Sequence, residues 1–300
     1  MNRAEEGVLL LCSSLGQENS KPLTMAQFRD LGMRVRASGI QGDASRELNR
    51  SDLCGIGYSE AQADSILRLL DRQSILEQYL SRAESMGIYP ITRLSDQYPI
   101  RIAARKKLSS PPVLFCMGDV ELLKQPSAAV VGSRVLKDGN AAFARNAGVR
   151  IAKENLTLVS GGAAGADLAA QEACLSNGGH AVIFLPDRLS ARKPVDRVLY
   201  CVEDGYDLPF SSQRALRRNA LIHMQGDLVL AAQCTYGSGG TWHGCLENLR
   251  QGWTPVFVFD DGSDGARALI ERGATGVREL VRIRDLQPSQ LSIFDERSKA

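Results

Sequence analysis

The chain has 300 residues, of which 44% are hydrophobic and 23% charged, and its formal net charge at neutral pH is +2. This length accommodates two domains with sizeable cores, and the composition is that of an ordinary globular protein. No apolar run approaches the roughly 20 residues needed to span a bilayer, and the acidic start MNRAEEG is a poor signal peptide. We therefore expect a cytoplasmic protein without a membrane partner, and any affinity for nucleic acid must come from a local basic patch.

The cysteines and histidines form no pattern that is typical of a metal site or a disulfide framework. No two of the seven cysteines have CxxC spacing, and the histidines, at positions 180, 223 and 243, are widely scattered. Several cysteines lie in apolar runs, which indicates buried or free thiols in a reducing compartment. We therefore expect neither a metal ion nor a cofactor.

Residues 1–85 are predicted to form a smaller helical domain, because apolar residues recur at helical spacing without a clear strand pattern. Within them, residues 53–61 read LCGIGYSEA, a short helix followed by a glycine turn and the start of a second helix. This pattern resembles a helix-hairpin-helix, a family in which backbone N–H groups at the turn contact a DNA phosphate. Ala61 is expected to allow close packing of the two helices. A turn that only packs two helices explains this single copy equally well.

Residues 86–126 are predicted to be a connector between the helical part and a second domain. The segment is rich in proline, with a short strand expected at 113–115 and a small helix at 120–124. It carries a basic cluster of Arg101, Arg105, Lys106 and Lys107. Such clusters are usually solvated, and an extension of a nucleic-acid path is the alternative.

Residues 127–284 alternate between apolar strand patterns and helical patterns. Strands are expected at 128–131, 156–159, 181–185, 198–202, 227–232 and 255–259. One helix is expected to follow residue 134 and to end near residue 153. Further helices are expected at 167–176, 213–224, 241–250 and 263–272. This alternation predicts an α/β domain with a Rossmann-like, doubly wound, mostly parallel sheet.

Glycine turns follow three of the expected strands, and the central one, in the segment 157–186, opens a strand–helix–strand unit. Because the carboxyl ends of parallel strands lie at one edge of a sheet, these turns are expected to meet there. Glycines allow close approach of a ligand to the backbone, and helix N-termini favour anions such as phosphate. The turns supply Gly132, Ser133, Arg134, Ser160, Gly161, Gly162, Ser238, Gly239 and Gly240 as candidate phosphate-binding residues.

The helix expected at 213–224 adds Arg214, Arg217, Arg218 and Asn219 to this candidate site. Spacings of three and four residues place the three arginines on one helix face. A solvated face is the common role of such a cluster, but few acidic residues interleave with it here, which favours a functional role. Asp167 is expected to cap its own helix, where a carboxylate accepts N–H bonds.

Several motifs occur in an order that resembles the DprA family of DNA-processing proteins, also called Smf, over most of the chain. The motifs are SPPVLF at 110–115 with Gly118-Asp119, AVVGSR at 129–134, VSGGAAGAD at 159–167, Arg218-Asn219 and SGGT at 238–241. The resemblance implies a Rossmann-like core that binds single-stranded DNA, loading of a RecA-type recombinase in natural transformation, a homodimer and no known catalysis. It also implies that Arg134 holds phosphate with the adjacent turn, that residues 160–162 offer N–H groups, and that Arg218 and Asn219 line the groove.

The chain departs from this family at three places. Residues 164–167 read AGAD where the family has Arg-Gly-Ile-Asp, and Gln171 stands where a histidine is usual. Residues 215–220 read ALRRNA where the family has Phe-Pro-x-Arg-Asn-Arg, so one aromatic and one arginine are missing. Because stacking of a base on an aromatic ring contributes about 1–3 kcal/mol, we expect weaker or altered DNA binding.

Residues 285–300 are predicted to form a tail. It carries Gln290, Leu291, Ile293 and Phe294, in a pattern that resembles the short peptide by which bacterial replication and repair proteins bind the sliding clamp. A tail that folds back onto its own domain is an equally good interpretation.

Two alternatives to a DNA-binding mediator of DNA uptake and recombination stay open. Residues 238–241 resemble part of the signature of LOG-type phosphoribohydrolases, but Gly244 stands where that signature has its glutamate, and the nearest acid is Glu247. A sensor that binds a nucleotide-like signal in the same cradle is the second alternative. The function favoured by the sequence is single-stranded DNA binding without catalysis.

Overall fold

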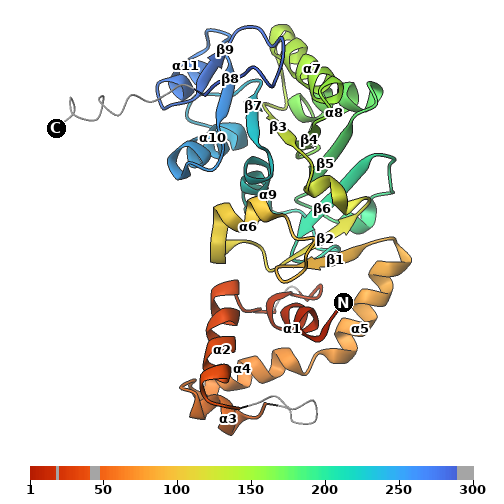
Figure 1. Ribbon diagram of the computed structural model, residues 1–300, viewed down its shortest axis with the longest axis vertical. Helices are drawn as coiled ribbons and strands as arrows, with labels where there is room; N and C mark the ends of the chain where they lie inside the picture. The colour runs from red at the N-terminus through yellow and green to blue at the C-terminus, as the bar shows by residue number, and fades with distance from the viewer. Residues whose placement is uncertain (18–19, 41–47, 289–300) are drawn as a thin grey trace, which may run out of the picture. The chain divides into compact units, whose positions relative to one another are not determined.

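The computed structural model describes residues 1–17, 20–40 and 48–288. The chain divides into two compact units (Figure 1). The helical unit comprises Met1–Met117, Asp187–Lys193 and Val202–Pro209, and the sheet unit comprises Gly118–Pro186, Pro194–Cys201 and the chain from Phe210 onwards. None of the helices in the described ranges is both long enough and apolar enough to cross a membrane.

The described residues between 1 and 85 fold into five helices. The helices are α1 (Arg3–Cys12), α2 (Met25–Ala37), α3 (Arg50–Gly55), α4 (Glu60–Leu70) and α5 (Gln73–Ser85). The side chains of Asn2, Thr24, Asn49 and Ser59 each accept a bond from the backbone three residues on, and the side chain there bonds back. These capping boxes satisfy N–H groups that the helix cannot satisfy itself, which explains where the first four helices begin.

Helices α3 and α4 form the hairpin expected from the glycine turn. Gly57 has a φ of +94°, a region that glycine enters readily. The Arg34 guanidinium donates from Nη1 to the carbonyl oxygens of Ile56 (3.2 Å) and Gly57 (3.3 Å). The expected role of Ala61 is wrong: it is exposed, and Ala63 is the fully buried alanine. The buried face of α4 is formed by Ala63, Ile66 and Leu69, and residue 61 does not lie on it.

The segment predicted as a connector contains more regular structure than expected. It holds β1 (Tyr89–Thr92), α6 (Ile100–Lys106), the short 3₁₀ helix η1 (Lys107–Ser109), β2 (Val113–Met117) and η2 (Val120–Leu123). Strands β1 and β2 pair antiparallel, with Tyr89 opposite Cys116. The boundary between the two compact units falls after Met117, inside the predicted connector.

The sheet unit contains a parallel sheet with the strand order β6-β5-β4-β3-β7-β8-β9. These strands are β3 (Ser127–Val131), β4 (Thr157–Ser160), β5 (His180–Phe184), β6 (Val198–Glu203), β7 (Leu228–Ala231), β8 (Val256–Phe259) and β9 (Thr275–Val277). The α-helices of this unit are α7 (Asp138–Lys153), α8 (Ala166–Ser176), α9 (Ser212–Gln225), α10 (Gly239–Gln251) and α11 (Asp264–Ile270). One more 3₁₀ helix, η3 (Leu189–Ala191), belongs to the helical unit. The predicted doubly wound α/β fold is confirmed.

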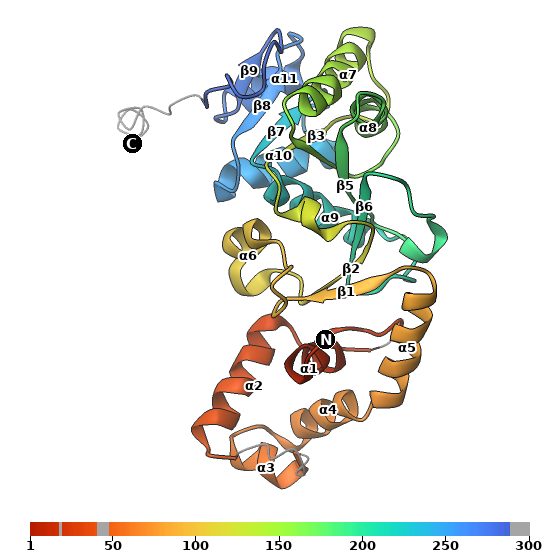
Figure 2. The same ribbon diagram turned by 45° about the vertical axis from the view of Figure 1, so that its right-hand side comes forward.

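The direction of winding reverses at β3. From β3 the chain passes through α7 to β4 and through α8 to β5, whereas β7, α10 and β8 lead the other way. Figures 1 and 2 show the α7–α8 pair and the α9–α10 pair on opposite faces of the sheet. The central strand β3 is buried along its whole length. The switch point, where ligands bind in such folds, therefore lies at the carboxyl ends of β3 and β7.

Candidate nucleic-acid interface

The loops that follow β3, β4 and β7 meet at the carboxyl edge of the sheet, as predicted. Gln233 lies two residues after β7 and connects the loop after β7 to the loop after β3. Its carbonyl oxygen accepts a bond from the Ser133 N–H (3.0 Å), and its side chain donates to the Val135 carbonyl (3.1 Å) and accepts from the Lys137 N–H (3.0 Å). These bonds fix the loop that carries Arg134 against the loop that leads into α10.

The loop after β4 is packed against the loop after β3 without room for a side chain. A Cβ atom at Gly165 would lie 2.2 Å from the Ser133 carbonyl oxygen, and one at Gly132 would lie 2.4 Å from the Cβ of Ala166. The Ala166 N–H donates to that same Ser133 carbonyl (3.2 Å). The start of α8 is therefore held directly against the turn that follows β3.

The Asp167 side chain holds the glycine turn after β4 through two hydrogen bonds. Its Oδ2 atom accepts bonds from the Gly161 N–H (3.1 Å) and the Ala163 N–H (3.3 Å). The expectation that Asp167 caps α8 is therefore wrong: the N-cap is Gly165, and the carboxylate turns back toward the preceding loop. The Gly161 N–H, expected to face a phosphate, is engaged inside the protein.

Arg218 lies buried beside the same turn. It is 8% exposed, and a Cβ atom at Gly161 would lie 1.3 Å from Arg218 Nη1 and 2.9 Å from Asp167 Oδ2. The guanidinium and the carboxylate thus share the space next to Gly161. Burial raises the pKa of Asp167 to about 6, while the Arg218 charge, the two backbone N–H groups and the Ser160 hydroxyl oppose that rise.

The arginines of α9 lie in three different environments, although their spacing suggests one face. Arg214 is half-buried and donates from Nε to the Pro186 carbonyl (3.3 Å), Arg217 is exposed, and Arg218 is buried. The expectation that Arg218 lines an open groove is therefore wrong. Arg217 on α9 and Arg134 on the loop after β3 are both exposed.

The N-terminus of α10 is open at this edge. Ser238, Gly239 and Gly240 are exposed, the first turn holds no acidic residue, and the Ser238 side chain accepts no capping bond within the described part of the chain. A Cβ atom at Gly240 would lie 2.9 Å from Asn219 Nδ2, so the Asn219 amide adjoins this N-terminus. Uncapped N–H groups and the helix dipole favour an anion here.

The structure brings the candidate residues together but exposes them to different degrees, with Gly132, Ser133, Arg214 and Asn219 half-buried. Those that face solvent are Gly162, Arg134, Arg217, Ser238, Gly239 and Gly240. Ser160, Gly161 and Arg218 are buried and shape the turn. Gln233 was not among the residues expected from the sequence, although its position directly after a predicted strand was an available signal. The residues expected to bind the clamp, Gln290, Leu291, Ile293 and Phe294, lie outside the described residues.

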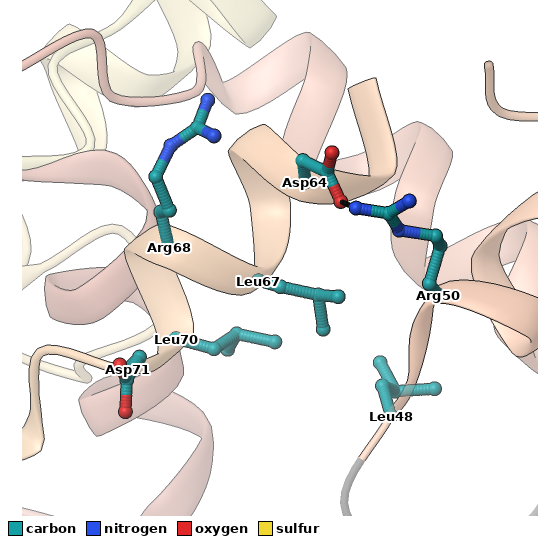
Figure 3. Close-up of a pocket in the computed structure, with 7 residues that line it drawn as sticks. All are labelled: Leu48, Arg50, Asp64, Leu67, Arg68, Leu70 and Asp71. Atoms are coloured by element: carbon teal, nitrogen blue, oxygen red, sulfur yellow. Dashed lines mark ion pairs between the residues drawn. The ribbon is translucent and has the colours of Figure 1, made fainter. Parts of the chain in front are cut away.

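Other parts of the described chain show no comparable arrangement. Within the described residues, no group of three or more His, Cys, Asp or Glu side chains could hold a metal ion. A hollow of the helical unit is lined by residues of α3 and α4 and their flanks (Figure 3). There the Arg50 guanidinium pairs with Asp64 at 2.5 Å, among the side chains of Leu48, Leu67 and Leu70.

Comparisons with known proteins agree with this fold. A family model, that of DNA recombination-mediator protein A, matches residues 90–286. The DNA processing protein DprA of Streptococcus pneumoniae is 29% identical over 194 residues, which are 60% of this chain and 68% of that protein. Protein Smf of Escherichia coli is 29% identical over 237 residues, 74% of this chain and 62% of that protein. The chain thus spans less than two thirds of Smf.

Two solved structures share the fold. The X-ray structure of DprA from Streptococcus pneumoniae superposes with a TM-score of 0.64 and 24% identity, covering 92% of this chain and 95% of that one. A structure that addresses the single-stranded DNA binding mode of DNA processing protein A from Helicobacter pylori gives a TM-score of 0.55 and 24% identity, covering 65% and 92%. Because the family model matches well over half of the chain, this protein belongs to the DNA recombination-mediator protein A family.

Proposed function

We propose that this protein binds single-stranded DNA along the carboxyl edge of its parallel sheet and acts as a mediator of DNA uptake and recombination. The observation that carries this proposal is the union of three loops at the switch point, one of which carries the exposed Arg134. The exposed Arg217 of α9 follows in the same unit, next to the buried Arg218. Membership of a recombination-mediator family supports the proposal, as does the single-stranded DNA binding addressed for the Helicobacter pylori relative.

Binding in this proposal is electrostatic and independent of sequence. Arg134 and Arg217 neutralise phosphates, and the N–H groups at the start of α10 donate hydrogen bonds to another phosphate at the positive end of the helix dipole. The buried side chains of Asp167 and Arg218 contact no DNA. They hold the glycine turn in the shape that allows a strand to approach the backbone.

The proposal is tested by fluorescence anisotropy of labelled single-stranded and duplex oligonucleotides at several salt concentrations. We expect a preference for the single strand and an affinity that falls with salt. Arg134→Ala should lower the slope of log affinity against log salt by about 0.7, the value for one phosphate contact on a single strand. Arg145→Ala, which removes an exposed arginine from α7, is the matched control and should change nothing. Equal slopes for the two variants would remove Arg134 from the site.

The proposal also includes three protein partners: a recombinase, a second copy of this chain and the sliding clamp. Loading of a RecA-type recombinase and assembly as a homodimer are supported by the family alone, and strand-exchange assays and sedimentation test them. Binding of the sliding clamp rests on the tail sequence at 290–294. Deletion of residues 289–300 should abolish capture of the clamp, and capture unchanged by the deletion would refute this part.

We further propose that the protein acts without catalysis. The phosphoribohydrolase signature requires a glutamate at Gly244, where a Cβ atom would lie 2.9 Å from the Nε2 atom of the buried His223. The nearest acid, Glu247, lines a different hollow with His243 and Arg250. Incubation with AMP or NAD followed by chromatography should show no product, and release of a free base would refute this part. Thermal-shift screening with nucleotides tests the sensor alternative.

A further inference from the structure

Tyr236 lies in the loop between β7 and α10, at the same edge of the sheet as the proposed phosphate contacts. Thr235 and Ser238 form an isolated bridge, and the Ser238 N–H donates to the Thr235 carbonyl (3.3 Å). Gly237, which follows the tyrosine, has a φ of +71°. Tyr236 thus occupies the corner of a tight turn whose backbone is fixed on both sides.

The Tyr236 ring is supported on one side and exposed on the other. It meets the Trp242 ring at a centroid distance of 5.1 Å and an interplanar angle of 63°. Trp242 is only 5% exposed, and the Arg272 guanidinium lies 5.6 Å from its ring centroid. Tyr236 itself is 57% exposed. A large aromatic face is therefore held in place, so that little side-chain freedom remains to be lost on binding.

Tyr236 lies close in sequence to residues of both proposed phosphate contacts. Tyr236 is three residues after Gln233, whose side chain holds the Arg134 loop, and three residues before Gly239, where α10 begins. Single exposed aromatic residues are common on protein surfaces and need no explanation by themselves. Here the fixed turn, the aromatic support and the place between two anion-binding elements coincide.

We propose that Tyr236 is a stacking platform for one nucleobase of the bound strand. This inference rests on the proposed function and adds a contact to the bases, where the other contacts reach only the backbone. A base stacked on a tyrosine ring is bound through its π-face, which every base has, so the platform leaves the protein tolerant of sequence. The ligand class is a purine or pyrimidine base of a single strand.

The experiment compares a labelled oligo(dT) with an abasic deoxyribose-phosphate polymer of the same length, which keeps the phosphates and lacks the bases. The wild-type protein should prefer oligo(dT), and Tyr236→Ala should reduce that preference about tenfold, in the range for one stacked base. Tyr236→Phe should keep the preference. Tyr236→Leu, which retains an apolar contact with Trp242 if alanine disturbs the turn, should lose it. The salt slope on either polymer should not change.

Phe210→Ala is the matched control, because Phe210 is similarly exposed (53%) in the same unit but precedes α9. It should leave the preference for oligo(dT) unchanged. An equal loss of affinity for both polymers in Tyr236→Ala, or loss of the preference in Phe210→Ala alone, would overturn the inference while leaving the proposed function intact. A wild-type protein that binds neither polymer would overturn the proposed function, and this inference with it.

Discussion

Replacing Gly161 with alanine tests the buried arrangement beneath the glycine turn. Gly161 has an ordinary backbone conformation, so the perturbation is steric: the new methyl group would lie 1.3 Å from Arg218 Nη1 and 2.6 Å from its Cζ. Ordinary contact requires about 3.4 Å or more, so the guanidinium, which is the far end of a flexible side chain, must shift away from Gly161 and interact less favourably with Asp167. Breaking a buried pair by removing one partner costs roughly 3–5 kcal/mol, and overpacking costs about 1–3 kcal/mol.

Because one displacement causes both effects, they do not add, and we expect Gly161→Ala to lower the unfolding free energy by about 3 kcal/mol. For a domain of this size that is a fall in Tm of roughly 6–12 °C. The assay is denaturant unfolding with thermal melting, in the wild-type and Arg218→Ala backgrounds. Arg218→Ala is destabilising alone, because it leaves the buried Asp167 carboxylate without its cation, but it removes the clash.

The Gly161→Ala substitution should therefore cost little in the Arg218→Ala background, which corresponds to a coupling energy of about 2 kcal/mol or more. Gly139→Ala in α7 is the control: the nearest atom to its new methyl group is 3.9 Å away, so a neutral or stabilising effect is expected. The same cost of Gly161→Ala in both backgrounds would refute the placement of Arg218 against this turn.

Two further predictions concern the buried His223 and the half-buried Gln233 of the sheet unit. Burial lowers the pKa of His223 to about 4 from 6.5, so the unfolded chain binds its proton more strongly and the unfolding free energy falls as the pH drops from about 6.5 toward 4. An NMR titration should find this imidazole neutral at pH 5, and a midpoint near 6.5 would contradict the burial. Gln233→Ala removes the side-chain bonds to Val135 and Lys137, each worth about 1 kcal/mol. It should weaken DNA binding in the anisotropy assay without changing the salt slope, and an unchanged affinity would show that the loops do not depend on this side chain.

The sequence predicts most of the sheet unit because its strands are short apolar runs, as in residues 128–131, bounded by glycine turns. Strands β1 and β9 escaped prediction for a physical reason. Tyr89–Thr92 contains Pro90, and Thr275–Val277 is too short to show a period, so their pairing with β2 and β8 decides their conformation. Local sequence does not encode that partner.

The location of the candidate site could be predicted from the sequence, whereas the roles of its residues could be predicted only in part. Parallel strands share an edge, so the convergence of the glycine turns follows from topology. Helical spacing groups Arg214, Arg217 and Arg218 but does not say which of them points toward the sheet. Likewise, a carboxylate at the start of α8 suggests a cap, whereas the N–H groups of Gly161 and Ala163 in the preceding loop compete for Asp167 successfully.

The burial of Arg218 changes how a loss of DNA binding in its variants must be interpreted. Counterion release counts only the cations that neutralise phosphates, so the salt slope reports direct contacts. Arg218→Ala should lower affinity, because the glycine turn loses its support, while the slope stays at the wild-type value. Arg134→Ala should lower the slope itself, because its side chain is exposed at the proposed contact. A reduced slope in Arg218→Ala would place its guanidinium on the DNA and would require the buried arrangement beside Gly161 to open when a strand binds.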